Sequence, residues 1–167
     1  MRIIPNLIPE STIGVINSEI DSYADPEKSR CWGSSHLQWN SNLFDDISGS
    51  CLSATPSSLI LLRLRSSLIK HLPASNHISF NYHLWLKHSG INWHDDGSHI
   101  FGATLYLNEW KKEWGGLFLW EESDGLHAIC PSPGTLVINT KHEPHSVTQI
   151  TARAPYPRRS VQIWGKN

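Results

Sequence analysis

The stretch 77-HISFNYHLWLK-87 alternates between two kinds of side chain. Its even-numbered positions carry Ile, Phe, Tyr and Leu, whereas its odd-numbered positions are mostly polar. Successive side chains of a β-strand point to opposite faces of a sheet, so this alternation predicts a strand that buries one face in a hydrophobic core. The β part of the chain is therefore predicted to begin at His77.

Short segments of the same kind continue toward the end of the chain. Turn residues separate them, including Ser89-Gly90, Gly97-Ser98 and Asp124-Gly125. A series of about eight short strands with no helix between them favours a jelly-roll barrel or sandwich. We expect a double-stranded β-helix (jelly-roll, cupin-like) core. The candidate strands after the first are Ile91–Asp96, His99–Asn108, Gly116–Trp120, His127–Ile129, Thr135–Asn139, His145–Ile150 and Arg159–Trp164.

Two supporting helices are predicted before this region. The first spans Pro9–Tyr23, and the second begins with Thr55 as its N-cap and Pro56 as its first helical residue. Between them, Ser29–Ser53 is rich in Ser, Asn and Gly and predicts irregular structure with one short strand near His36–Trp39. We expect both helices to cover one sheet from outside. Their apolar positions at helical spacing are Ile13, Ile16 and Ile20 in the first and Leu61, Leu64, Leu68 and Leu72 in the second.

Length and composition indicate one folded domain that is mainly β. The 167 residues fit a single domain, with residues 1–76 as helical support and residues 77–167 as the jelly-roll core. Charged residues make up 17% and aromatic residues 10% of the chain, which excludes a disordered protein.

Charge and cysteine content exclude several classes of partner. Lys and Arg number 14 against 15 Asp and Glu, a net charge of -1, so we expect no binding to nucleic acid or to an anionic membrane. The densest apolar stretch, Leu59–Leu72, contains three basic residues and predicts no membrane span. The three cysteines form no C-x-x-C pair, which favours a reducing compartment. We expect a cytoplasmic monomer.

The segment Trp93-His94-Asp95-Asp96-Gly97 carries the first sign of chemistry. In a strand, residues i and i+2 share a face, so His94 and Asp96 are predicted to hold one ion together while Asp95 points away. These two residues supply two-thirds of a 2-His-1-carboxylate triad, which leaves open positions on Fe(II). A third ligand has to come from elsewhere in the chain.

Two histidines flank Pro144 and are candidates for that third ligand. His142 falls in the turn before Pro144, whereas His145 opens an alternating strand, which fixes the direction of its side chain. We therefore predict that His145 completes the metal site. Taken alone, an H-x-D motif in a chain with ten histidines also occurs by chance, as a surface turn.

Further motifs follow in an order that resembles the 2-oxoglutarate and Fe(II)-dependent oxygenases, in particular their prolyl 4-hydroxylase-like branch. The resemblance covers His77 to Gly165, about half of the chain. The matching segments are His94 with Asp96, Ala103–Trp110 with its Tyr-Leu-Asn sequence, the Gly115-Gly116 strand start, Pro133–Asn139, His145-Ser146-Val147 and the R-x-S strand Arg158–Trp164.

The resemblance implies a jelly-roll enzyme that hydroxylates an unactivated C–H bond and releases succinate and CO2. Its cofactor would be Fe(II), its cosubstrates 2-oxoglutarate and O2, with ascorbate as a candidate accessory reductant. The resemblance places the far carboxylate of 2-oxoglutarate on Arg158, with help from Ser160 and the Tyr106 hydroxyl. A planar guanidinium suits this task because it binds a carboxylate through two parallel hydrogen bonds.

Peptidyl proline is the substrate class that the resemblance implies. Trp85 and Trp164 are our own candidates for the substrate pocket. One departure concerns Trp85, since many prolyl hydroxylases have a Tyr in that neighbourhood. Two alternatives therefore stay open: hydroxylation of a free amino acid or other small molecule, and a non-catalytic jelly-roll binding module whose tryptophans stack on a ligand. Trp32 and Trp39 are either packing residues or caps of a substrate groove.

Overall fold

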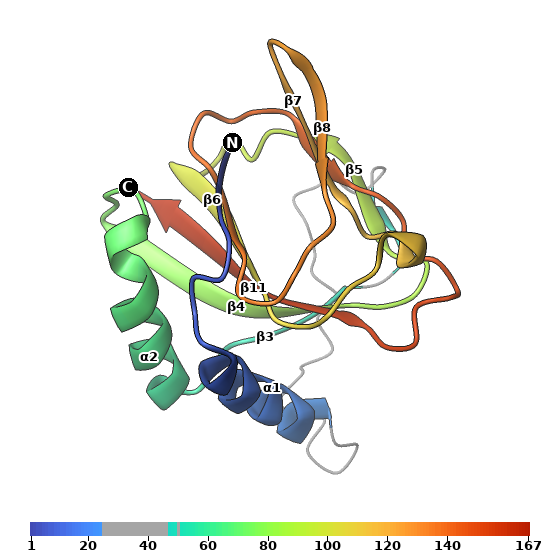
Figure 1. Cartoon of the computed structure of the whole chain (residues 1–167). Coiled ribbons are helices and arrows are strands. Elements are labelled where there is room, and N and C mark those ends of the chain that lie inside the picture. Colours follow the sequence, from blue (N-terminus) through green and yellow to red (C-terminus); the bar gives the residue numbers. More distant parts are fainter. Residues whose placement is uncertain (25–46, 50) are drawn as a thin grey trace.

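A computed structural model describes residues 1–24, 47–49 and 51–167 of the chain. Within these ranges, two antiparallel sheets face each other (Figure 1). The larger sheet has the strand order β1-β9-β6-β11-β4-β3, and the smaller has the order β2-β5-β10-β7-β8. The strands are β1 (Arg2–Ile4), β2 (Ile47–Ser48), β3 (Cys51–Ala54), β4 (His77–Trp85), β5 (Gly90–His94), β6 (Phe101–Tyr106), β7 (Phe118–Glu122), β8 (Gly125–Ile129), β9 (Leu136–Asn139), β10 (His145–Val147) and β11 (Arg158–Lys166). This architecture confirms the predicted mainly β, jelly-roll fold.

The long strands β4 and β11 lie side by side in the larger sheet and separate two apolar cores. Their register runs from Arg158 opposite Trp85 to Lys166 opposite His77. The even-numbered side chains of β4 pack toward the helices, together with Leu105 of β6 and Val161 of β11. Trp85 belongs instead to a second core between the sheets. The alternation read in the sequence therefore divides the interior into a helix-facing and a sheet-facing layer.

Two helices, α1 (Glu10–Ala24) and α2 (Ser58–Leu68), cover the outer face of the larger sheet, as predicted (Figure 1). The predicted apolar face of α1 is confirmed, because its three isoleucines are buried. On α2 the buried residues are Ile60, Leu64 and Leu68. Two short 3₁₀-helices, η3 (Ile69–His71) and η4 (Lys112–Trp114), complete the described elements. No described helix combines the length and the apolar character needed to cross a bilayer.

Two sequence predictions about the region before β4 are wrong. The N-cap of α2 is Ser57 and not Thr55, because the Ser57 side chain accepts the Ile60 amide. The prediction of irregular structure with one short strand for Ser29–Ser53 missed β2, which lies in this segment, and β3, which begins in it, and these strands pair with β5 and β4. Backbone pairing with these partners creates short edge strands that local composition does not signal. The strand expected near His36–Trp39, and both Trp32 and Trp39, lie outside the described residues.

The carboxylate of Glu19 joins both helices to the sheet. It accepts hydrogen bonds from the Ser57 backbone amide at 2.9 Å, from the Ser57 hydroxyl, and from the Tyr82 hydroxyl at 2.9 Å. Glu19 is on α1, Ser57 caps α2, and Tyr82 is a fully buried residue of β4. This contact explains why Ser57 is the N-cap of α2, because a distant carboxylate holds that residue in place.

Glu19→Ala should lower the free energy of unfolding by about 1–3 kcal/mol, since it removes the carboxylate that accepts hydrogen bonds from Ser57 and Tyr82. Urea unfolding monitored by circular dichroism measures the change. Glu10→Ala, an exposed substitution on the same helix, is the matched control. Equal stability of the two variants would contradict the joining role of Glu19.

The buried His83 of β4 is expected to make the stability of the fold depend on pH. Only 2% of His83 is exposed. Burial, together with the nearby Arg158 charge, lowers the pKa of His83 to about 3. In the unfolded chain a histidine has its ordinary pKa of about 6.5. Between these two values the unfolded chain binds more protons than the folded one, so stability falls as the pH falls through this window.

His83→Gln should therefore flatten the acid side of the stability profile. For one proton, the wild-type slope is at most about 1.4 kcal/mol per pH unit, and the variant should lose this contribution between pH 6 and pH 4, roughly the middle of the window. Urea unfolding at a series of pH values provides the measurement. Identical slopes for wild type and variant would show that His83 is not kept neutral by the fold.

Candidate active site

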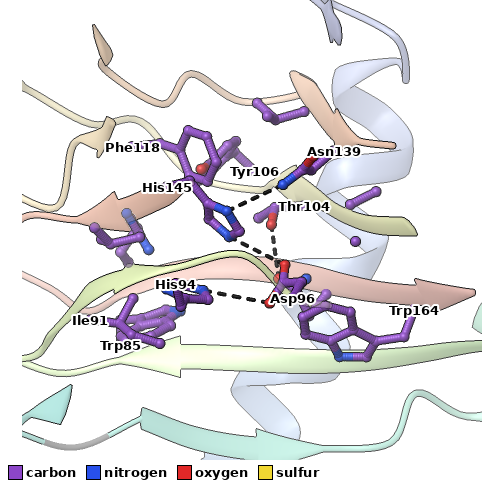
Figure 2. A pocket seen from close by; sticks show the side chains of 16 residues that line it. Trp85, Ile91, His94, Asp96, Thr104, Tyr106, Phe118, Asn139, His145 and Trp164 are labelled. Carbon is purple, nitrogen blue, oxygen red and sulfur yellow. Dashed lines mark hydrogen bonds and ion pairs between the residues drawn. The ribbon is translucent and has the colours of Figure 1, made fainter. Parts of the chain in front are cut away.

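One pocket between the two sheets collects the residues that the sequence singled out. Figure 2 shows its 16 lining side chains, which come from both sheets. His94 and His145 lie in the smaller sheet, and Arg158, Tyr106 and Trp164 lie in the larger one. All eight predicted site residues except Ser160 line the pocket. Ser160 is fully buried on β11, directly opposite Tyr106 of β6.

His94, Asp96 and His145 converge within this pocket (Figure 2). His94 Nε2 lies 3.5 Å from Asp96 Oδ1, and His145 Nε2 lies 3.2 Å from Asp96 Oδ2. One candidate ligand atom from each residue lies within 4.8 Å of the others. Two imidazole nitrogens and one carboxylate on the same side of an ion form the donor set of a facial triad. These residues therefore fit a divalent metal such as Fe(II).

A β-bulge aims His94 into the pocket. Strands β5 and β10 pair His94 with His145 and Ile91 with Val147, so two residues of β5 face one residue of β10. A bulge of this kind re-aims the side chains that follow it. Ile91 and His94 consequently both line the pocket, although regular alternation would place them on opposite faces.

Asp96 lies beyond the end of β5, so the prediction that it shares a strand with His94 is wrong. Its backbone adopts a left-handed conformation with a φ of 58°, which is uncommon for a residue other than glycine. This turn brings the Asp96 carboxylate back toward both histidines, whereas Asp95 is exposed and accepts the Gly97 amide at 2.9 Å. Asp96 therefore faces the histidines and Asp95 points away, as expected, but the cause is a turn and not the alternation of a strand.

Backbone carbonyls fix the tautomers of both histidines. His94 Nδ1 lies 2.8 Å from the carbonyl oxygen of Asn92, and His145 Nδ1 lies 3.0 Å from that of Glu143. A carbonyl only accepts hydrogen bonds, so each Nδ1 carries the hydrogen and each Nε2 is left to bind an ion. His142, the other candidate, is exposed in the preceding turn with a φ of 54°.

Asn139 holds the loop that carries His145, a role that sequence reasoning missed. Its Nδ2 donates to the Glu143 carbonyl at 2.9 Å, and its Oδ1 accepts the amides of Glu143 at 3.1 Å and Lys141 at 3.3 Å. The same Glu143 carbonyl accepts hydrogen bonds from Asn139 Nδ2 and from His145 Nδ1. No pattern in the sequence marks Asn139, because these bonds depend on the closed geometry of the loop.

Burial and the Asp96 carboxylate act in opposite directions on the pKa of each histidine. Burial lowers the pKa of His145, but the hydrogen bond and charge of Asp96 outweigh burial and leave that pKa raised. Burial and the His145 charge lower the pKa of His94.

Gly102 of β6 leaves room for the Asp96 carboxylate. A Cβ atom at this position would lie 2.7 Å from Asp96 Oδ2 and 2.9 Å from Cζ3 of Trp164. Trp164 in turn stacks on His99 with ring centroids 4.3 Å apart. The absence of a side chain at residue 102 therefore allows both Asp96 and Trp164 to occupy this end of the pocket.

Arg158 lies in the same pocket and is only 2% exposed. Its guanidinium packs 5.4 Å from the centroid of the Trp85 ring and 5.6 Å from that of Tyr106, and Nη1 donates to the Gly116 carbonyl. Among the described residues, no carboxylate pairs with Arg158 and nothing accepts from its Nε. Burial lowers the pKa of this guanidinium. A buried cation without an anion is costly, so the site fits an anionic ligand.

Two hydroxyls accompany this guanidinium. Burial raises the pKa of Tyr106, and the Arg158 charge opposes that rise, so the hydroxyl is neutral and able to donate. The Ser160 hydroxyl is buried and has no hydrogen-bond partner among the described residues. The neighbouring Arg159 points to the other side of β11 and pairs with Asp21 of α1 at 2.6 Å. The predicted opposite directions of Arg158 and Arg159 are confirmed.

Comparison with solved structures shows the same fold. A Pseudomonas putida prolyl-4-hydroxylase matches with a TM-score of 0.69 and 18% identity, over 99% of this chain and 91% of that one. A viral collagen prolyl hydroxylase from Paramecium Bursaria Chlorella virus-1 matches with a TM-score of 0.60 and 12% identity, over 98% and 93% of the two chains. HygX from Streptomyces hygroscopicus, solved with nickel and 2-oxoglutarate, matches with a TM-score of 0.65 and 11% identity, over 99% and 82%.

Comparison of the sequence itself identifies the family. No curated protein matches the chain. The family profile of the 2OG-Fe(II) oxygenase superfamily matches residues 78–166, which is more than half of the chain. This match supports the hypothesis of an enzyme over that of a non-catalytic binding module. The chain therefore belongs to the 2OG-Fe(II) oxygenase superfamily, whose members are dioxygenases that use Fe(II) and 2-oxoglutarate.

Proposed function

We propose that this oxygenase hydroxylates a peptidyl proline, with Fe(II) held by His94, Asp96 and His145. When bound, Fe(II) with 2-oxoglutarate and O2 supplies the oxidising chemistry that releases succinate and CO2 and adds one oxygen atom to the substrate. The three side chains bind the metal from one side, and the carbonyls at Nδ1 keep both imidazoles oriented. The opposite side is left for cosubstrate and substrate.

The observation that carries the proposal is Arg158, which is buried in the same pocket as the triad and pairs with no carboxylate among the described residues. In our proposal its guanidinium binds the far carboxylate of 2-oxoglutarate, and the hydroxyls of Tyr106 and Ser160 donate to the same group. A dicarboxylic acid can satisfy this cation at one end and reach the metal with the other. A metal-binding module that used no 2-oxo acid would have no need of a buried guanidinium here.

Trp85 and Trp164 form apolar walls on the larger sheet and are our candidates for contact with the substrate. A proline ring is apolar and flat enough to pack on such aromatic surfaces. The likeness of the whole chain to two prolyl hydroxylases is consistent with this choice, although at 18% and 12% identity it extends only to the fold. A free amino acid or other small molecule is the second candidate, which is favoured by Trp85 where many prolyl hydroxylases have Tyr.

The substrate proposal is tested by incubating the Fe(II) protein with 2-oxoglutarate, O2 and a panel of proline peptides, free amino acids and other small molecules. Succinate formation and a product heavier by one oxygen atom should appear with a proline peptide. Turnover of a free amino acid and of no peptide would contradict the peptide substrate and support the second candidate. If the protein binds Fe(II) and 2-oxoglutarate but forms no succinate with any compound, both substrate candidates are contradicted.

Asp96→Ala and His145→Ala should each weaken Mn(II) binding by more than about a hundredfold, because each removes a direct ligand. Even the loss of a residue that only hydrogen-bonds to a ligand lowers metal affinity by about 10- to 100-fold. Asp95→Ala and His142→Ala are the matched controls, and both should bind Mn(II) like the wild type. Calorimetric titration with Mn(II) measures the affinity. Greater damage from either control than from its partner would overturn the ligand assignment.

Arg158→Ala should weaken 2-oxoglutarate binding by roughly a hundred- to few-thousand-fold, since breaking a buried ion pair costs about 3–5 kcal/mol. Metal affinity should stay unchanged. Arg158→Lys should recover only part of the binding, because an ammonium lacks the planar fork. Titration of 2-oxoglutarate into the anaerobic Fe(II) protein measures the effect, and Arg159→Ala serves as control. Wild-type affinity in Arg158→Ala would refute this subsite.

A further inference from the structure

A row of polar side chains crosses the pocket between Arg158 and Asp96. On β11, residues 158, 160, 162 and 164 share one face, and they pair across β6 and β4 in successive rows. Arg158 lies opposite Trp85, Gln162 lies opposite Thr104, and Trp164 lies opposite Gly102. The Asp96 carboxylate sits against Gly102, in the row of Trp164. The row of Gln162 and Thr104 therefore lies between the two ends of the site.

The side chains of this row are joined to each other. The Thr104 hydroxyl donates to Gln162 Oε1 at 2.8 Å, and both residues line the pocket. With Oε1 occupied in this way, the Nε2 group of Gln162 is directed away from Thr104. Among the described residues nothing accepts a hydrogen bond from Nε2, although Gln162 is partly buried. The pocket thus contains an oriented amide donor that the protein itself does not use.

We infer that Gln162 is a positioning residue for 2-oxoglutarate, and that its Nε2 donates to the carboxylate at the iron-chelating end. This inference rests on the proposed function. A molecule that extends from Arg158 to the triad has to pass the row of Gln162 with its metal-proximal half. A hydrogen bond from an amide to a carboxylate is charge-assisted, so it is stronger than one to a neutral group.

Thr104 acts through Gln162. An amide side chain can turn over and present either its oxygen or its nitrogen to the pocket. In the arrangement observed, the Thr104 hydroxyl donates to Oε1, and this bond leaves the Nε2 donor free to face the ligand. An inverted amide would direct an oxygen at the carboxylate and repel it. Loss of the Thr104 hydroxyl should consequently weaken the binding of 2-oxoglutarate, although Thr104 itself does not contact this ligand.

The experiment is a calorimetric titration of 2-oxoglutarate into the Mn(II)-loaded, full-length protein. Gln162→Leu, which keeps the volume but removes the donor, should raise the dissociation constant about tenfold to a hundredfold, as expected for one hydrogen bond to a charged group. Gln162→Glu should raise it further, because two carboxylates then face each other. Thr104→Val should raise the dissociation constant by a smaller factor. Thr104→Ser, which keeps the hydroxyl, should have the wild-type dissociation constant.

Controls separate this inference from the proposed function. The Mn(II) affinity should be the same in all four variants, and the exposed Gln149→Leu should bind 2-oxoglutarate like the wild type. A wild-type protein that binds no 2-oxoglutarate would refute the proposed function itself. A wild type that binds it, with unchanged affinity in Gln162→Leu, would overturn only the role of Gln162. If the Gln162 variants do not fold, equal affinities of Thr104→Val and Thr104→Ser would overturn it instead.

Discussion

The burial of the Arg158 guanidinium is the constraint on which the rest of the site depends. This side chain is enclosed by the rings of Trp85 and Tyr106 and held by the Gly116 carbonyl, yet no described carboxylate neutralises it. Such a cation is tolerable only if the strand that carries it is secured on both sides and if an anion can reach it. Strand β11 meets the first condition through its long pairings with β4 and β6.

The same strand connects the two layers of the protein. Arg158 enters the pocket, whereas Arg159 reaches the Asp21 carboxylate on α1, so neighbouring residues serve the site and the helical cover. The smaller sheet contributes the opposite wall, where a bulge, a left-handed Asp96 and the loop held by Asn139 bring three donor atoms together. The larger sheet, with its regular strands, therefore supplies the anion subsite, and the smaller sheet, with its bulge and adjoining turn, supplies the metal site.

This division explains what could be predicted from the sequence. The directions of Arg158 and Arg159 follow from period two because β11 is a long, regular strand. The same reasoning failed for the geometry of His94 and Asp96, since a bulge and a turn interrupt the period there. The choice of Ser57 as the N-cap of α2 depends on Glu19, 38 residues away, and capping rules that use only neighbouring residues do not include such a contact. Thr104 and Gln162 could have been found, because they share strand faces with Tyr106 and Arg158.

Diffraction at the iron absorption edge, from crystals of the anaerobic complex with Fe(II) and 2-oxoglutarate, tests the central claim most directly. The account predicts one anomalous peak bonded to Nε2 of His94, to Nε2 of His145 and to the Asp96 carboxylate. It also predicts 2-oxoglutarate extending from that peak to the Arg158 guanidinium. A peak at the other described His and carboxylate cluster, Glu122 with Asp124 and His127, or a ligand whose far carboxylate does not reach Arg158, would contradict it.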